Sequence, residues 1–262
     1  MLKSDGMAIE AEELCVRYAR SAEPQVRDFS ATFGTGINAL IGRNGAGKST
    51  FMNAVVSLQP TFSGRLRVLG VDLPAAERYR RELMSRVGYL PQNFGFIPGF
   101  TVREVVEYAA WLKQLPSAKR RTAVDRALEM VGLQEHAQQK IGKLSGGMQR
   151  RVGIAHSIVH DPELVVLDEP TSGLDPEQRI RFRDSLRRVA EDRCVLVSSH
   201  LIEDVRAIAT QVYVLNAGRL VFSGTVSEME DYSMPDAPGD TVLERAYTSL
   251  IGGTPGSNMR SQ

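Results

Sequence analysis

The sequence lacks long apolar runs and an excess of charge of either sign. No stretch approaches the roughly 18 consecutive apolar residues that a helix needs to cross a bilayer, and the first residues do not form a secretory signal. Lysine and arginine number 32 against 31 aspartate and glutamate residues, and the net charge of +1 provides no field that draws in nucleic acid. We interpret the basic run at residues 119–121 as a solvated helix face rather than a binding patch. We therefore expect a soluble, intracellular chain that does not bind nucleic acid, and any membrane pathway has to come from another chain.

Cysteine is scarce, which argues against a disulfide framework. The two cysteines, Cys15 and Cys194, fall on different candidate strands and lack the spacing of a metal site. We expect free thiols in a reducing compartment. Internal repeats are also absent, and 262 residues can bury a sizeable core. We expect one domain over residues 1–230, followed over residues 231–262 by a linker, a short helix and a disordered tail.

One glycine-rich segment has the composition of a phosphate-binding loop. It consists of Gly42, Arg43, Asn44, Gly45, Ala46, Gly47, Lys48, Ser49 and Thr50. Its glycines let backbone N–H groups wrap around phosphates, Lys48 can reach the β- and γ-phosphates, and Ser49 can offer a hydroxyl to Mg²⁺. Residues 37–41 before it suit a buried strand and residues 49–58 after it have helical spacing. This segment predicts a site for a nucleoside triphosphate and magnesium.

Two adjacent carboxylates follow another buried strand. Residues 164–167 are apolar and lead directly into Asp168 and Glu169, with Pro170 next. Ligands bind at the carboxyl edge of such sheets. Asp168 would hold Mg²⁺ directly or through water, and Glu169 would orient and polarise the attacking water. The alternative is an ordinary solvated turn.

The order of six motifs resembles the ATP-binding subunit of an ABC transporter over roughly residues 7 to 225. The motifs are the phosphate-binding loop, Gln92, Leu144-Ser145-Gly146-Gly147, Asp168-Glu169, Ser172-Gly173-Leu174-Asp175 and His200. The resemblance implies that two subunits pair head to tail, as a homodimer here, and enclose two ATP molecules with Mg²⁺. It also implies an α/β fold: a RecA-like core of the P-loop NTPase class with an antiparallel β subdomain and a helical insertion.

The resemblance gives three residues roles within the same subunit. Gln92 would touch the Mg²⁺ or the water and report the nucleotide state to the helical insertion. His200 would bond the γ-phosphate and position Glu169, and Tyr18 would stack on adenine. Other interpretations remain: Tyr18 as an ordinary core or surface aromatic, and His200 as a simple helix cap.

Other motif residues would act on the opposite subunit. The resemblance implies that Ser145, Gly146 and Gly147 contact the γ-phosphate held by the partner, and that Asp175 crosses the dimer interface. Ser145 also suits an N-cap, and both roles are compatible. Two positions depart from the common pattern, since Met148 stands where glutamine is frequent and His156 where arginine is frequent. We expect these to alter packing or turnover and not phosphate contacts.

Helical spacing dominates the segment between Gln92 and the second glycine motif. Thr101 and Glu104 form a capping box, and we expect a mostly helical insertion from about residue 93 to about residue 150. Asp175 followed by Pro176 starts a further helix. The aromatic loop at residues 94–100 belongs either to the core of the insertion or to a groove that receives a helix from another protein.

The resemblance implies an ATPase at the cytoplasmic face of the membrane, docked on a separate integral membrane permease. The single cassette, Met148 and the tail at residues 242–247 look like bacterial export systems, so we expect export. The alternative is a soluble member of the family that acts in assembly or nucleic-acid metabolism. Such members usually carry two cassettes or long insertions, which this sequence does not show.

Overall fold

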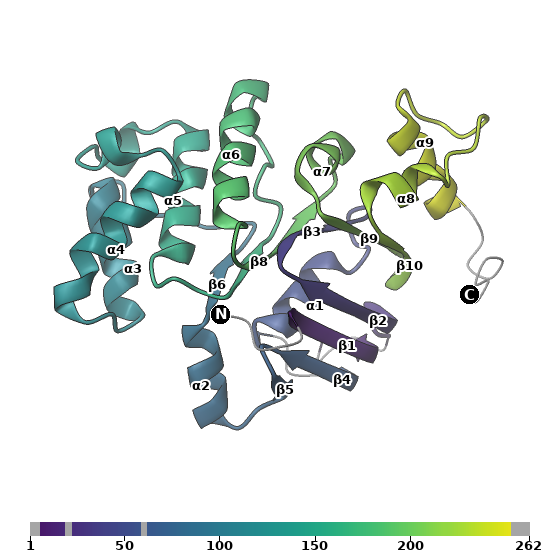
Figure 1. The fold of residues 1–262 in the computed structure, drawn as a ribbon, viewed down its shortest axis with the longest axis horizontal. Coiled ribbons are helices and arrows are strands. Elements are labelled where there is room, and N and C mark those ends of the chain that lie inside the picture. The colour runs from purple at the N-terminus through teal and green to yellow at the C-terminus, as the bar shows by residue number, and fades with distance from the viewer. Residues whose placement is uncertain (1–5, 19–22, 59–61, 253–262) are drawn as a thin grey trace.

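The strands form two sheets, one antiparallel and one mostly parallel (Figure 1). The computed structural model describes residues 6–18, 23–58 and 62–252. The smaller sheet is antiparallel with strand order β2-β1-β4-β5. Its strands are Met7–Val16 (β1), Val26–Gly34 (β2), Phe62–Val68 (β4) and Val71–Leu73 (β5). β1 ends at Val16, and Tyr18 lies beyond it.

The larger sheet is parallel apart from one edge strand. Its order is β10-β9-β3-β8-β7-β6, and only β10 runs against its neighbour β9. Its strands are Gly36–Ile41 (β3), Val87–Leu90 (β6), Leu164–Leu167 (β7), Cys194–Ser199 (β8), Gln211–Asn216 (β9) and Arg219–Gly224 (β10). Burial on both faces explains the nearly continuous apolar sequences of β3, β7 and β8. The parallel order brings the ends of β3, β8 and β7 side by side.

Helices surround the two sheets. They are Lys48–Val55 (α1), Glu77–Ser85 (α2), Val102–Leu112 (α3), Ser117–Met130 (α4), Gly146–Ile158 (α5), Pro176–Val189 (α6), Ile202–Ile208 (α7), Val226–Glu230 (α8) and Val242–Gly252 (α9), with 3₁₀ turns at Gln134–His136 and Ile141–Lys143. Figure 1 shows α3, α4 and α5 together at one end of the molecule and α8 and α9 at the other. Within the described ranges, no helix is both long and apolar enough to span a bilayer.

Several helix boundaries differ from the sequence predictions. α1 ends at Val55 and not at residue 58, and α2, which is mostly charged, was not predicted. The predicted capping box of α3 is present in both directions, and the short helix expected within residues 231–262 lies at Val242–Gly252. The tail predicted to be disordered lies, from residue 253 on, outside the described residues.

Apolar side chains fill two cores, one on each face of the larger sheet. Alternate residues of β3 divide between them: Ile37, Ala39 and Ile41 join the core under α3 to α6, whereas Leu40 joins the core under α1 and the smaller sheet. Phe29, Phe33 and Phe51 stack within this second core. Tyr18 is 43% exposed, so its interpretation as a core aromatic is wrong. Both cysteines are free thiols, as predicted.

Candidate nucleotide site

The glycine-rich loop joins β3 to α1 and draws the Lys48 side chain inward. The Lys48 Nζ donates to the carbonyl oxygens of Gly42 at 2.8 Å and Arg43 at 3.3 Å, and the residue is buried. Gly47 has φ +105°, and a Cβ there would lie 2.5 Å from the carbonyl oxygen of Gln25. A side chain at this position is therefore excluded twice, by conformation and by space. No side chain caps α1, which leaves its first N–H groups available for an anion.

The two carboxylates end β7 beside this loop. Glu169 Oε1 lies 3.3 Å from Lys48 Nζ, and Glu169 Oε2 lies 2.5 Å from His200 Nδ1. Glu169 is buried, and its Oε1 has no partner in hydrogen-bonding geometry. The carboxylate of Glu169 thus lies between an ammonium and an imidazole. Its Oε1 can still accept a hydrogen bond from a donor such as water. A solvated turn, the alternative for this segment, does not describe buried carboxylates.

Ser198 belongs to the same cluster, and sequence reasoning missed it. Its Oγ donates to Asp168 Oδ1 at 2.6 Å and accepts from the Glu169 backbone N–H at 2.7 Å. The available signal was a polar pair, Ser198 and Ser199, at the end of a strand whose other residues are apolar. Without the strand pairing, that signal does not say which residues the serines meet.

Neither Tyr18 nor Gln92 is hydrogen-bonded to this cluster among the described residues. Thr50 Oγ1 donates to the Tyr18 hydroxyl at 3.2 Å, which holds the tyrosine against α1. Gln92 is exposed, and its backbone carbonyl accepts from Arg150 Nη1 at 2.9 Å. Among the described residues, no hydrogen bond or ion pair joins the Gln92 side chain to Asp168 or Ser49. The contact predicted for Gln92 stays a prediction.

The second glycine motif and Asp175 form a separate group. Ser145 accepts from the Met148 N–H at 3.2 Å and caps α5, and Asp175 accepts from the Gln178 N–H at 2.8 Å and caps α6. A Cβ on Gly147 would lie 2.5 Å from Gln178 Oε1, so the two helix starts pack closely. Ser145, Gly146 and Asp175 are exposed. In the described part of the chain, no hydrogen bond or ion pair joins this group to the side chains of Lys48 or Glu169.

The donor atoms beside the loop suit magnesium better than a softer metal. No group of three or more His, Cys, Asp or Glu residues that could hold a metal occurs in the described ranges. A metal here would rely on the Asp168 carboxylate, the Ser49 hydroxyl and oxygens from water or phosphate. Magnesium typically binds in this way, through one or two protein oxygens with the rest from substrate and water. The residues present therefore fit a magnesium nucleotide.

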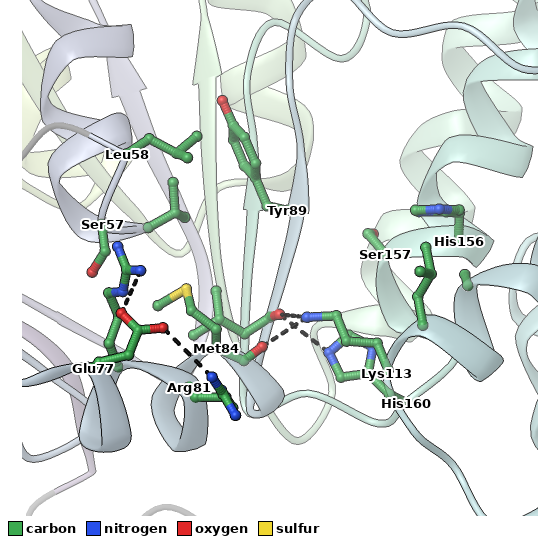
Figure 2. Close-up of a pocket in the computed structure, with 15 residues that line it drawn as sticks. Ser57, Leu58, Glu77, Arg81, Met84, Tyr89, Lys113, His156, Ser157 and His160 are labelled. Carbon is green, nitrogen blue, oxygen red and sulfur yellow. Dashed lines mark hydrogen bonds and ion pairs between the residues drawn. The ribbon is translucent and has the colours of Figure 1, made fainter.

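A groove of about 500 Å³ lies beside β6, between α2, α3 and α5 (Figure 2). Lys113 Nζ donates to the carbonyl oxygens of Met84 at 2.7 Å and Val87 at 3.0 Å. His160 Nε2 lies 3.1 Å from the same Val87 oxygen. Burial lowers the pKa of Lys113, and no carboxylate among the described residues opposes its charge. The groove thus combines apolar side chains with an ammonium that, among the described residues, forms no ion pair, since the carboxylate of Glu77 in the same lining pairs with Arg80 and Arg81.

The buried His160 should make stability depend on pH. Burial lowers its pKa to about 3, with Lys113 acting in the same direction. Since the unfolded histidine titrates near 6.5, the unfolded state binds more protons between these two values, and stability falls as the pH drops through that window. We expect the free energy of unfolding to decrease by up to about 2 kcal/mol from pH 7 to pH 5 through this residue alone.

Urea unfolding at both pH values measures the effect. His160→Gln should reduce the difference between pH 7 and pH 5, whereas His136→Gln, on the 3₁₀ turn Gln134–His136, serves as the control and should preserve it. Equal differences for the parent and His160→Gln would assign the pH dependence to other groups.

Comparison with known proteins places the chain in a family. The model of the ABC transporter family matches residues 26–172. The chain belongs to the ABC transporter family. Its described relatives are ATP-binding subunits of such transporters. The P-loop α/β fold expected from the sequence is confirmed by solved ABC subunits: one titled as an ATP-binding subunit of an ABC transporter has a TM-score of 0.76 and 23% identity over 93% of this chain and 99% of that chain.

Relatives of this ABC subunit act in both directions of transport. It is 35% identical to the uncharacterized ABC transporter ATP-binding protein YxlF of Bacillus subtilis, over 73% of this chain and 62% of that protein. It is 35% identical to the methionine import ATP-binding protein MetN of Bifidobacterium longum, over 88% and 57%. Nod factor export ATP-binding protein I of Burkholderia pseudomallei is 36% identical over 71% and 60%. The matches thus span about three-fifths of each relative's length, and the likeness favours neither import nor export.

Proposed function

We propose that this ABC subunit hydrolyses ATP, pairs with a second copy around two ATP molecules, and powers transport through a separate membrane permease. The observation that carries the proposal is the cluster of Lys48, which begins α1, with Glu169 and His200, which follow β7 and β8. ATP turnover by the purified chain, compared with turnover by a Glu169→Gln variant, tests it.

Each residue of the cluster has a defined task in this proposal. Lys48 holds the β- and γ-phosphates, and its ammonium neutralises charge that develops there. Glu169 accepts the proton of the attacking water, and His200 fixes the carboxylate in the orientation for that transfer. Ser49 and Asp168, with Gln92 as a further ligand, would hold Mg²⁺, which would supply positive charge that offsets the charge of the phosphates.

The second copy supplies the remaining phosphate contacts. Ser145 and Gly146 are exposed at the N-terminus of α5, where N–H groups and the helix dipole favour an anion. Because no hydrogen bond or ion pair joins this group to Lys48 among the described residues, we propose that a composite site takes its two halves from two chains. We propose that Ser145, Gly146 and Gly147 contact the partner's ATP, that Asp175 crosses the interface, and that Tyr18 and residues 42–50 bind the chain's own ATP.

The permease docks at the groove between α2, α3 and α5, and the subunit lies at the cytoplasmic face of the membrane. Two exposed apolar side chains, Leu58 and Leu112, line it, and its helices α2 and α3 also carry the exposed Tyr79, Tyr108 and Trp111. Exposed apolar side chains beside a groove suit a partner helix. The unneutralised Lys113 favours a helix that brings a carboxylate. For the direction of transport we propose export, supported by Met148 and the tail helix α9.

The aromatic loop after Gln92 contributes to this region mainly through packing. Phe94 and Phe96 contact each other with ring centroids 5.4 Å apart and pack against the core of the helical insertion. A Cβ at Gly153 of α5 would lie 3.0 Å from the Phe94 ring. Phe100 is 38% exposed. Alanine at Phe94 or Phe96 would therefore disturb the insertion itself, and a test of docking needs an exposed residue of the groove.

Leu112→Asp should separate docking from stability. Leu112 lines the groove and is 51% exposed, so aspartate costs the isolated subunit little, whereas a partner helix would have to bury its charge. We expect at least about a tenfold loss of the membrane protein that co-purifies from detergent-solubilised membranes. Melting temperature and ATP turnover of the isolated subunit should stay unchanged.

Val242→Asp is the matched control, because Val242 is 45% exposed at the start of α9, at the opposite end of the molecule. If both variants retain the membrane protein equally, the docking surface lies elsewhere. If Leu112→Asp melts at a much lower temperature, Leu112 is a core residue and the groove has to be tested at another position.

A further inference from the structure

The penultimate residue of strand β8 is a buried serine beside the two carboxylates of the site. Ser198 is fully buried, and the four residues before it are Cys194, Val195, Leu196 and Val197. The parallel register pairs Leu167 with Val197, so the next residues of the two strands, Asp168 and Ser198, also lie side by side. The position of the serine is therefore fixed by the sheet and not by a loop.

One hydroxyl makes two short hydrogen bonds to consecutive residues. Ser198 Oγ donates to Asp168 Oδ1 at 2.6 Å and accepts from the Glu169 backbone N–H at 2.7 Å. A serine hydroxyl has one proton to donate and two lone pairs, so its donor is fully used by the carboxylate. Asp168 is 4% exposed, and water cannot readily replace that bond. Alanine, cysteine or valine at this position could not make both contacts equally well.

The backbone of Glu169 needs such a restraint. Its φ of +47° lies in the left-handed region, which is unfavourable for a residue with a side chain. Residues held in this region persist where the surroundings determine them, and they gather at functional sites. The N–H bond to Ser198 holds the main chain, while His200 and Lys48 hold the carboxylate end.

We propose that Ser198 is a positioning residue that fixes Asp168 and Glu169 relative to each other. The metal-side carboxylate and the general base are thus tied to the same hydroxyl. This inference rests on the proposed ATP hydrolysis, and it adds a residue that none of the six motifs contains. Its loss should affect the chemical step and the use of Mg²⁺, and should leave the contacts of the phosphate-binding loop with nucleotide intact.

Ser198→Ala removes both hydrogen bonds and is the central variant. Because a displacement of about 1 Å in a reacting group can cost about 100-fold in rate, we expect kcat to fall by about 10- to 100-fold while KM for ATP changes by less than about threefold. The Mg²⁺ concentration for half-maximal turnover should rise. A fluorescent ATP analogue should bind as in the parent without Mg²⁺, and should gain less affinity than the parent when Mg²⁺ is added.

Two further variants separate positioning from folding. Ser185→Ala also removes a buried hydroxyl, which bonds the Arg181 carbonyl at 3.0 Å within α6, and it should change neither kcat nor the Mg²⁺ requirement. Ser198→Thr keeps the hydroxyl and should restore most of the turnover lost in Ser198→Ala. If the added methyl group disrupts packing, the Mg²⁺ titration of analogue binding by Ser198→Ala still decides the question.

The outcomes distinguish this inference from the function on which it rests. If Glu169→Gln hydrolyses ATP as the parent does, the proposed function is wrong. If Glu169→Gln is inactive but Ser198→Ala keeps kcat within about twofold and an unchanged Mg²⁺ requirement, only the role of Ser198 is overturned. Loss of metal-free analogue binding in proportion to kcat would also overturn it, since a folding defect and not a displaced carboxylate produces that pattern.

Discussion

Glu169→Gln should keep ATP bound and lower kcat by about 100-fold or more, which is the usual contribution of a positioned general base. The amide preserves the size of the side chain, and its oxygen can still face Lys48, whose Nζ lies 3.3 Å from Glu169 Oε1. It cannot accept a proton from water and provides no negative charge. Phosphate release measures turnover, and a fluorescent ATP analogue measures binding. Size-exclusion chromatography with ATP should show an accumulated dimer.

Glu163→Gln is the matched control for this substitution. Glu163 directly precedes β7, at the end opposite Glu169, and its carboxylate pairs with Arg86 at 2.6 Å. The same chemical change there removes a partly buried ion pair and should leave kcat unaffected. Turnover by Glu169→Gln within a few-fold of the parent would show that another group activates the water.

Local motifs explain why much of the site could be predicted from the sequence. The loop at residues 42–50 can be predicted from sequence because the glycines, the lysine and the hydroxyl that it needs all lie within nine consecutive positions. The same is true of Asp168 and Glu169 at the end of a buried strand, and of the caps at Ser145 and Asp175. In each case, neighbours in sequence are neighbours in space.

The parts that escaped prediction depend on contacts between distant segments. Ser198 lies 30 residues from Asp168, and only the pairing of β7 with β8 shows that they meet. The left-handed backbone of Glu169 leaves no trace in residue type. Helix α2 was missed because seven of its nine residues, Glu77-Arg78-Tyr79-Arg80-Arg81-Glu82 and Ser85, give no apolar stripe, and only Leu83 is buried. The groove could not be foreseen either, since α2, α3 and α5 have to assemble first.

Strand β6 connects this groove to the site through its backbone. At its start, the Val87 carbonyl accepts from Lys113, and at its end the Leu90 carbonyl accepts from the Asp168 N–H at 2.9 Å. Gln92 follows two residues later and is held through its own carbonyl by Arg150, whose guanidinium lies 5.0 Å above the Phe94 ring. A displacement at the groove therefore has a short, hydrogen-bonded route to the metal-side carboxylate. This adjacency amounts to energetic coupling only if the groove and the nucleotide site respond to the same change. Nucleotide binding by the Leu112→Asp variant should therefore be measured together with its docking to the membrane protein.

Mixing Lys48→Ala and Ser145→Arg subunits should restore ATP hydrolysis that neither variant shows alone. Ser145 and Lys48 belong to groups that no hydrogen bond or ion pair joins within the described part of one chain, so in our proposal a composite site takes one group from each subunit. A mixed dimer then has one site with both residues altered and one intact site. With random pairing and independent sites, an equal mixture should recover up to about a quarter of the parent rate. Phosphate release at a fixed total protein concentration measures it.

A second mixture provides the control, because Lys48 and Glu169 form one cluster with 3.3 Å between their charged atoms. Lys48→Ala combined with Glu169→Gln damages both sites of every mixed dimer and should recover nothing. Ser145→Arg also removes the cap of α5, which costs about 1 kcal/mol, so its melting temperature has to be recorded to confirm that it folds. Recovery in the control mixture, or parent-like turnover that persists on dilution to monomers, would show that one chain completes its own site and that the head-to-tail pairing is wrong.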